Sequence, residues 1–166
     1  MNDNTHIDML PQAKNIRRLA LLVEYNGFRY HGFQAQGNAI SVQETIEDSI
    51  FSFTGERTRI KGAGRTDTGV HAKGQVISFD TTTHYAPEVF EHALNQRLPK
   101  DISIKEVTET RSSFDPRRDA ISRSYQYQIL NTSARSPLFE GYSYHVKTPL
   151  DIDRMNLAAQ SLEGLR

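Results

Sequence analysis

A glycine-rich stretch from Gly62 to Gly74 contains the residues of this chain that are best suited to chemistry. Four glycines in about thirteen residues predict tight turns, or a backbone that comes close to another molecule or segment. The polar side chains between the glycines are those of Arg65, Thr66, Asp67, Thr68 and His71. A carboxylate on such a loop is able to act as a nucleophile or to transfer a proton. A plain turn in which Asp67 bonds to nearby backbone would use the same residues.

The segments on either side of this stretch predict regular elements that would hold it in place. A nearly continuous apolar run at 19–23 is typical of a central strand. Ser41 and Glu44 form a capping box that begins a helix, and Gly55 is expected to end it. The same reasoning predicts a second helix and three more strands, namely a helix between Pro87 and Pro99 and strands at 57–63, 75–79 and 102–107. The resulting order is that of a ferredoxin-like βαββαβ core, an α+β fold in which the glycine-rich stretch joins the two middle strands.

Further elements are expected after this core. Alternation over 119–130 predicts an added strand, with one face formed by Ile121, Arg123, Tyr125, Tyr127 and Ile129 and with Tyr127 in the sheet core. A short strand at 142–146 and a C-terminal helix from Asp151 to Gly164 follow. The inner side of this helix is expected to carry Ile152, Met155, Ala159 and Leu162. Residues 1–15 are polar and aperiodic and are expected to form a mobile tail, so 16–166 is predicted as one α+β domain.

The composition excludes several classes of protein. The chain has 166 residues, 20 basic and 20 acidic side chains with a formal net charge of zero, and no cysteine. Disulfide frameworks and thiolate metal sites are therefore ruled out, and the six histidines show no metal-ligand spacing. A zero net charge argues against a protein that coats nucleic acid by bulk attraction. Because no run is long and apolar enough to span a bilayer and no secretory signal is recognisable, a cytoplasmic protein is expected.

Basic side chains are nevertheless concentrated in two stretches of the sequence. The first surrounds the glycine-rich stretch and contains Arg57, Arg59, Lys61, Arg65 and Lys73. The second contains Arg117, Arg118, Arg123 and Arg135. If the two stretches meet in the fold, they form a positive face that would bind the phosphates of a nucleic acid. Taken separately, each stretch is also explained as ordinary solvated charge.

Four segments together resemble a known family. The segment Gly64-Arg-Thr-Asp-Thr-Gly-Val-His-Ala72 closely resembles the signature of the TruA family of tRNA pseudouridine synthases, with Thr68 where that family usually has Ala. Three further segments are similar to motifs of the same family in order and spacing, namely Tyr25–Gln34, Leu94–Ile102 and Phe114–Tyr127. The resemblance extends over roughly residues 18–164, and four ordered motifs are far more specific than one.

The resemblance implies a fold and an activity. The fold would be the first, N-terminal half of a pseudouridine synthase, and the second family domain is expected to be absent from this chain. The activity would be the isomerisation of uridine to pseudouridine in the anticodon stem-loop of tRNA, at the tRNA positions numbered 38, 39 and/or 40 in the family. The resemblance also implies a homodimer and a reaction that needs no cofactor and no metal.

The same resemblance assigns roles to individual residues. Asp67 matches the catalytic aspartate, and Tyr125 matches an active-site tyrosine that would stack on the extruded uracil. Arg65 matches the arginine associated with base flipping, and it would pair with Asp67 or fill the gap that the base leaves. Independently of the resemblance, candidates for phosphate contacts are Arg117, Arg118, Arg123 and Lys73.

Two other functions remain open from the sequence. The predicted topology is also that of an RNA-recognition module, in which the third strand carries stacking aromatic residues. The segment Lys73–Asp80 lies at about the right place, but only its first two residues fit that motif. The chain is also compatible with a catalytically incomplete synthase fragment, active only after assembly with a further half.

Overall fold

The computed structural model describes residues 15–37 and 39–164 of the chain, so almost all of the predicted tail at 1–15 lies outside the described residues. The chain divides into two compact units, the first ending at Ile121 and the second beginning at Ser122. Within the two described ranges, none of the helices combines the length and the apolar character needed to cross a membrane.

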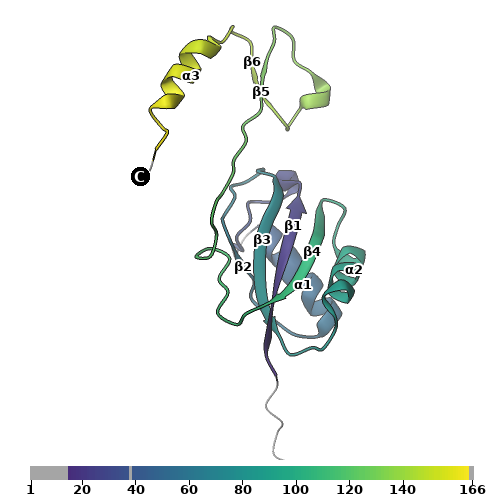
Figure 1. Cartoon of the computed structure of the whole chain (residues 1–166). Coiled ribbons are helices and arrows are strands. Elements are labelled where there is room, and N and C mark those ends of the chain that lie inside the picture. The colour runs from purple at the N-terminus through teal and green to yellow at the C-terminus, as the bar shows by residue number, and fades with distance from the viewer. Residues whose placement is uncertain (1–14, 38, 165–166) are drawn as a thin grey trace, which may run out of the picture. The chain divides into compact units, whose positions relative to one another are not determined.

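An antiparallel sheet of four strands forms the first unit (Figure 1). Its strands are β1 (Arg17–Tyr25), β2 (Lys61–Gly62), β3 (Ala72–Thr81) and β4 (Ile102–Thr110). Their order across the sheet is β2-β3-β1-β4, and every neighbouring pair is antiparallel. Helices α1 (Val42–Thr54) and α2 (Pro87–Arg97) cover one face. This arrangement confirms the predicted ferredoxin-like α+β core.

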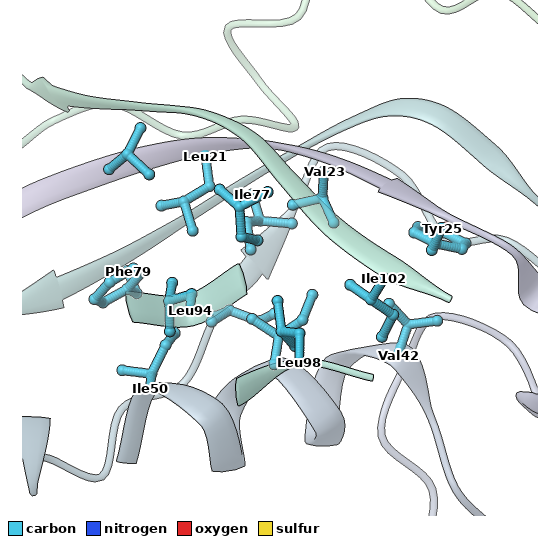
Figure 2. Close-up of a cluster of buried hydrophobic side chains, with 14 of the residues drawn as sticks. Leu21, Val23, Tyr25, Val42, Ile50, Ile77, Phe79, Leu94, Leu98 and Ile102 are labelled. Carbon is cyan, nitrogen blue, oxygen red and sulfur yellow. The ribbon is translucent and has the colours of Figure 1, made fainter. Parts of the chain in front are cut away.

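The core lies between the sheet and its two helices (Figure 2). Alternate residues of β1 point to the helices, and Leu19, Leu21 and Val23 are at most 1% exposed. The helices contribute buried side chains at the predicted helical spacing, namely Val42, Ile46 and Ile50 from α1 and Phe90 and Leu94 from α2. Each such side chain stabilises the fold by about 1.5–3 kcal/mol relative to an exposed one.

Local signals fix the ends of the first helix. The backbone N–H of Glu44 donates to Ser41 Oγ over 3.2 Å, and the Ser41 hydroxyl donates to Glu44 Oε2 over 2.7 Å. The first contact confirms the serine cap at the start of α1, whereas Glu44 bonds to the hydroxyl of Ser41 and not, as in a full capping box, to its backbone N–H. The helix ends at Gly55, whose backbone is left-handed with a φ of 73°.

The strand expected at 57–63 is wrong for most of its length, because β2 contains only Lys61 and Gly62. The residues before it make hydrogen bonds that involve side chains in place of a backbone ladder. The N–H of Ile60 donates to Glu47 Oε1 of α1 over 3.0 Å, and the Thr58 hydroxyl donates to the carbonyl of Asp80 over 3.2 Å. This segment is therefore held against a helix as well as against the sheet.

The second unit contains a small parallel sheet and one helix. Strand β5 (Ile129–Asn131) pairs with β6 (Tyr144–Val146), and a short 3-10 helix at Pro137–Phe139 lies between them in the sequence. Helix α3 (Ile152–Gln160) begins at Asp151, whose Oδ1 accepts the N–H of Arg154 over 3.0 Å. The predicted cap of α3 and the strand near 142–146 are thus confirmed.

The strand predicted over 119–130 is wrong except at its last two residues. Among the described residues, 120–128 form no strand, because a strand needs a neighbour to complete its hydrogen bonds and this stretch has no ladder partner. Tyr127, expected in the core, is 92% exposed. The predicted inner face of α3 is also exposed, as Ile152, Met155 and Leu162 show, because no described element of this unit covers it.

A bidentate ion pair joins the two central strands on the face opposite the helices. Arg18 of β1 lies directly across from Asp80 of β3. Its Nε donates to Asp80 Oδ1 over 2.6 Å, and its Nη2 donates to Asp80 Oδ2 over 2.7 Å. The hydrogen bond from Arg18 lowers the pKa of the Asp80 carboxyl. Arg18 also donates to the carbonyl of Phe114 over 2.9 Å and so holds the turn that contains the buried Pro116.

Replacing Asp80 with Asn tests this ion pair. Because the pKa of Asp80 is lowered by folding, its contribution to stability is present above the pKa of the unfolded chain, about 4, and is lost as the pH falls through the folded pKa. Asp80 is partly exposed, so screening limits the expected loss for Asp80→Asn to about 1 kcal/mol at neutral pH. Urea denaturation measures the difference, which should vanish in strong acid. A difference that persists there, or one equal to that of the exposed control Asp48→Asn, would contradict this role.

Candidate active site

Two loops at one end of the sheet are joined by backbone hydrogen bonds. The first loop is defined as residues 26–36, after β1, and the glycine-rich loop as residues 63–71, between β2 and β3. The N–H of Phe33 donates to the carbonyl of Thr66 over 3.0 Å, and the N–H of Gly69 donates to the carbonyl of Tyr30 over 3.3 Å. The two loops therefore form one unit, in which each determines the position of the other.

Two glycines of the first loop permit this close contact. A Cβ atom on Gly27 would overlap the carbonyl oxygen of Val70, and one on Gly32 would lie 2.8 Å from the carbonyl oxygen of Thr66. Gly32 also has a φ of 92°, which other residues rarely adopt. In addition, the N–H of Gly27 donates to Nδ1 of His71 over 2.9 Å. His71 therefore makes a contact between the two loops.

Thr66 points into the protein, whereas its neighbours Arg65 and Asp67 are exposed. The Thr66 hydroxyl lies 2.7 Å from the phenol oxygen of Tyr25, which is only 3% exposed. Burial raises the pKa of the Tyr25 phenol, so this group stays protonated. Because Thr66 is anchored by both its side chain and its carbonyl, the residues on either side are presented together on the outer side of the loop.

The first loop is anchored to the turn between α2 and β4. The phenol of Tyr30 donates to Oδ1 of Asp101 over 2.6 Å, and the N–H of Asn26 donates to the carbonyl of Asp101 over 2.8 Å. Burial and the adjacent carboxylate raise the pKa of Tyr30 far above its ordinary value. The phenol therefore remains a hydrogen-bond donor throughout the physiological pH range.

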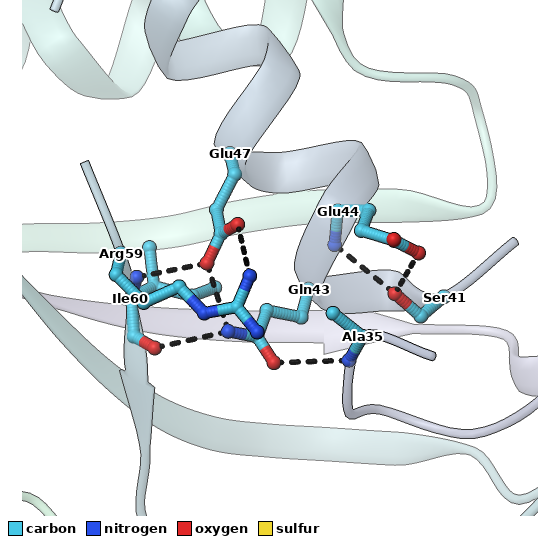
Figure 3. Close-up of polar contacts among 7 residues, drawn as sticks. All are labelled: Ala35, Ser41, Gln43, Glu44, Glu47, Arg59 and Ile60. Atoms are coloured by element: carbon cyan, nitrogen blue, oxygen red, sulfur yellow. Dashed lines mark hydrogen bonds and ion pairs between the residues drawn. The ribbon is translucent and has the colours of Figure 1, made fainter. Parts of the chain in front are cut away.

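Helix α1 holds the other end of the first loop through Gln43 (Figure 3). The buried side-chain amide of Gln43 accepts the N–H of Ala35 over 3.0 Å and donates to Glu47 Oε1 over 2.8 Å and to the carbonyl of Ile60 over 3.3 Å. One side chain thus links the first loop to the segment that enters the glycine-rich loop. Glu47 also forms an ion pair with Arg59 over 3.2 Å.

An open hollow of about 400 Å³ lies where the two loops meet, a size within the range of ligand pockets. Its lining residues are His31, Gln34, Gln36, Arg65, Thr66, Asp67 and Thr68. Within 15–37 and 39–164, the side chain of Asp67 has no hydrogen bond and no ion pair, and the pair expected between Arg65 and Asp67 is not formed. Both groups are therefore available to a ligand in the hollow.

The first basic stretch is only partly available for binding. Arg57 lies over the ring of Phe51 at 4.3 Å, and Arg59 is paired with Glu47. Lys73 of β3 is exposed, as is Arg65 on the rim of the hollow. Of the cations predicted around the glycine-rich loop, these last two are the best placed to meet an anionic ligand.

The second basic stretch begins in a turn organised by Asp115. The backbone N–H groups of Arg117 and Arg118 donate to Asp115 Oδ1 over 2.9 and 3.1 Å, and these bonds lower the pKa of the Asp115 carboxyl. Lys61 lowers the same pKa, so Lys61 of β2 lies near the turn that carries Arg117 and Arg118. Arg123 and Arg135 belong to the second unit. Acidic groups are interspersed among the basic groups of the first unit, namely Asp80, Asp115 and Asp119. The resulting surface is mixed in charge rather than uniformly positive.

Tyr125 and Arg123 belong to the second unit, where both side chains are exposed in the stretch that forms no strand. That Tyr125 shares an active site with Asp67 and that Arg123 contacts RNA phosphates both stay predictions. The sequence had not assigned His31, Gln34 and Gln36 to the site, although all lie within or directly after the recognised motif at Tyr25–Gln34. Their proximity to the glycine-rich loop depends on tertiary contacts and has no local signal. In the described part of the chain, no three His, Asp or Glu side chains are grouped as metal ligands would be.

Comparison with known proteins identifies the family. The sequence profile described as tRNA pseudouridine synthase matches residues 21–117, a range that contains both loops and the hollow. The chain belongs to the tRNA pseudouridine synthase family. The family assignment made from the four motifs is thus confirmed.

Several curated proteins named tRNA pseudouridine synthase A are similar to this member of the family. The protein from Pelobacter propionicus is 42% identical over 149 residues, covering 90% of this chain and 61% of the relative. The protein from Syntrophomonas wolfei is 43% identical over 147 residues, covering 89% of this chain and 59% of the relative. The protein from Acetivibrio thermocellus is 44% identical over 149 residues, covering 90% of this chain and 61% of the relative. The chain therefore spans about 60% of the length of these synthases.

Replacing Gln43 with Leu tests how α1 holds the two loops. The variant leaves the N–H of Ala35 and the carbonyl of Ile60 without their partner, so the free energy of unfolding should fall by about 1–3 kcal/mol. The amide of Ala35 should also exchange with solvent faster, as hydrogen exchange measures. Gln96→Leu, on the exposed side of α2, is the matched control. Equal effects of the two variants would show that Gln43 does not anchor the loops.

Proposed function

We propose that this protein isomerises uridine to pseudouridine in the anticodon stem-loop of tRNA, with Asp67 as the catalytic carboxylate. The observation that carries the proposal is the position of Asp67. Its side chain is exposed on a hollow of about 400 Å³ and has no partner within the described ranges, while the adjacent Thr66 is fixed through both side chain and backbone. A carboxylate without a partner, next to a residue whose position is fixed, is suited to contact the reacting atoms of a substrate.

The reaction breaks the bond between uracil N1 and ribose C1′ and re-forms the link at C5, with no net oxidation and no net hydrolysis. Three roles for Asp67 are compatible with this change. It attacks C1′, it attacks C6, or it moves a proton while it stabilises a sugar cation. None of these roles requires a cofactor or a metal, in agreement with the expectation from the resemblance.

Arg65 and Tyr125 complete the proposed catalytic set. Arg65 lies beside Asp67 on the rim of the hollow, where its guanidinium is suited to hold a phosphate or to fill the space left by the extruded base. Tyr125 is 74% exposed, so its ring is accessible for stacking on a base. Its role rests on the family motif rather than on a contact with Asp67.

The phosphates of the tRNA are proposed to contact Lys73, Arg117, Arg118 and Arg123, all of which are exposed. Such contacts position the RNA without reading its sequence, and the mixed charge of this surface limits non-specific attachment. The homodimer and the cytoplasmic location expected from the sequence stay predictions.

The alternative of a non-catalytic RNA-recognition module is disfavoured by the side chains on the open face of β3. In such modules, aromatic residues on the open face of the third strand stack on bases. Here Phe79 of β3 is 2% exposed and packs against Phe90 of α2, on the helix side. The described residues that alternate with Ile77 and Phe79 on β3 are Val76, Ser78 and Asp80, none of which offers a ring for stacking.

The replacement of Asp67 by Asn tests catalysis. The amide keeps the size of the side chain but removes the negative charge, so release of tritium from C5-labelled uridine in tRNA should fall by at least about a hundredfold. Affinity for tRNA should change little. Circular dichroism checks the fold, and Asp48→Asn provides a surface carboxylate control. Wild-type protein that binds tRNA without releasing tritium would favour the binding module or the incomplete fragment.

The replacement of Arg118 by Ala tests the proposed phosphate surface. The backbone N–H of Arg118 still bonds to Asp115 in the variant, so the turn should persist. Each lost phosphate contact should reduce the slope of log affinity against log salt concentration by about 0.9. The control is Lys105→Ala on β4, at the sheet edge opposite β2. If both variants keep the wild-type slope, Arg118 lies outside the interface.

A further inference from the structure

The hollow has two walls of different chemistry. The wall formed by the glycine-rich loop carries the charged groups of Arg65 and Asp67. The wall formed by the first loop carries an imidazole and two uncharged carboxamides, from His31, Gln34 and Gln36. Phosphate groups are usually held by Arg, by Lys or by backbone N–H groups. Carboxamides, by contrast, match the paired donors and acceptors along the edge of a nucleobase.

The backbone around Gln34 is fixed before any ligand binds. On one side, Phe33 donates its N–H to Thr66 over 3.0 Å and accepts the N–H of Gln43 over 2.9 Å. On the other side, the N–H of Ala35 donates to the side chain of Gln43 over 3.0 Å. Gln34 itself is half-buried, and its amide has no hydrogen-bond partner within the described part of the chain. Because the backbone that carries this unpaired amide is already fixed, only the torsions of the Gln34 side chain need to be ordered on binding.

One hydrogen bond within the first loop favours one orientation of the exposed Gln36 amide. Its Nε2 donates to the carbonyl of His31 over 3.3 Å, so Oε1 is left as a hydrogen-bond acceptor. Uracil presents a donor, N3–H, at the middle of its polar edge, whereas cytosine presents an unprotonated N3 at the same place. An acceptor at this place therefore favours uracil over cytosine.

We infer that Gln34 and Gln36 form a base-reading wall, which hydrogen-bonds to the polar edge of the extruded uracil opposite the Asp67 carboxylate. This inference rests on the proposed function for the identity of the ligand. Gln34 supplies an amide on a fixed backbone, and Gln36 supplies the acceptor that selects uracil. The two residues determine specificity, whereas Asp67 carries out the chemistry. Reading a flipped base at its Watson–Crick edge is the general means by which enzymes recognise it.

The test measures how much of the RNA affinity comes from the target base. Binding of an anticodon-arm RNA is compared with binding of the same RNA with an abasic sugar placed at each of its uridines in turn. For wild-type protein, loss of the target base should weaken binding by at least about fivefold. For Gln34→Leu, the ratio of the affinity for the intact RNA to the affinity for the abasic RNA should fall toward one. The control Gln96→Leu should keep the wild-type ratio. Because only a ratio within each variant is used, a general loss of stability does not imitate the effect.

A second arm tests the choice of base. Cytidine replaces the target uridine, and the ratio of the two affinities is measured for wild-type protein and for the surface variant Gln36→Leu. Wild-type protein should prefer uridine, and the variant should lose that preference. The inference is overturned if both glutamine variants keep the wild-type ratios, or if wild-type affinity does not depend on any uridine base. Failure of the proposed function is a separate outcome, seen as absent tritium release despite a binding ratio that depends on Gln34.

Discussion

The hydrogen bond from the N–H of Phe33 to the carbonyl of Thr66 is the contact on which the site depends. Together with the bonds from Gly69 to Tyr30 and from Gly27 to His71, it joins the loop after β1 to the loop before β3. Thr66 lies between the two charged residues of the hollow, and Phe33 precedes the half-buried glutamine of the opposite wall. A shift of this one contact would therefore move both walls at once, and the precision of the site depends on the rigidity of this backbone pair.

Much of the fold was predictable because its signals are local. The serine cap of α1, the glycine at its end and the proline at the start of α2 each satisfy a geometric need of the residue beside them. The strand expected around Tyr125 failed for a different reason. Alternation shows which side chains would share a face, but it does not supply the neighbouring strand that the backbone requires. Tyr127 shows the result, since its ring is exposed in a stretch with no ladder partner.

The candidate site was predictable only in part. Arg65 and Asp67 were found because they lie together within a short motif, and the structure places both on one hollow. The sequence did not predict that Gln34 lines the same hollow as Asp67, because their proximity arises from contacts between residues far apart in the sequence. The same holds for Gln43 and Asp101, which act from a helix and from a turn on the opposite side of the first loop. A sequence pattern reports which residues are neighbours along the chain, whereas these anchors are neighbours only after folding.

The inward position of Thr66 has a consequence for how this region can vary among related proteins. Thr66 turns toward Tyr25 while the residues before and after it face outward. One residue inserted or deleted between Gly62 and Thr66 would exchange the inner and outer positions, because successive side chains point to opposite sides of such a segment. A deletion would place the carboxylate of Asp67 against the Tyr25 phenol, an insertion would place the guanidinium of Arg65 there, and in both cases the Thr66 hydroxyl would move outward. Substitutions such as Thr68 for Ala preserve the spacing, so divergence here is expected in residue identity while the number of residues stays constant.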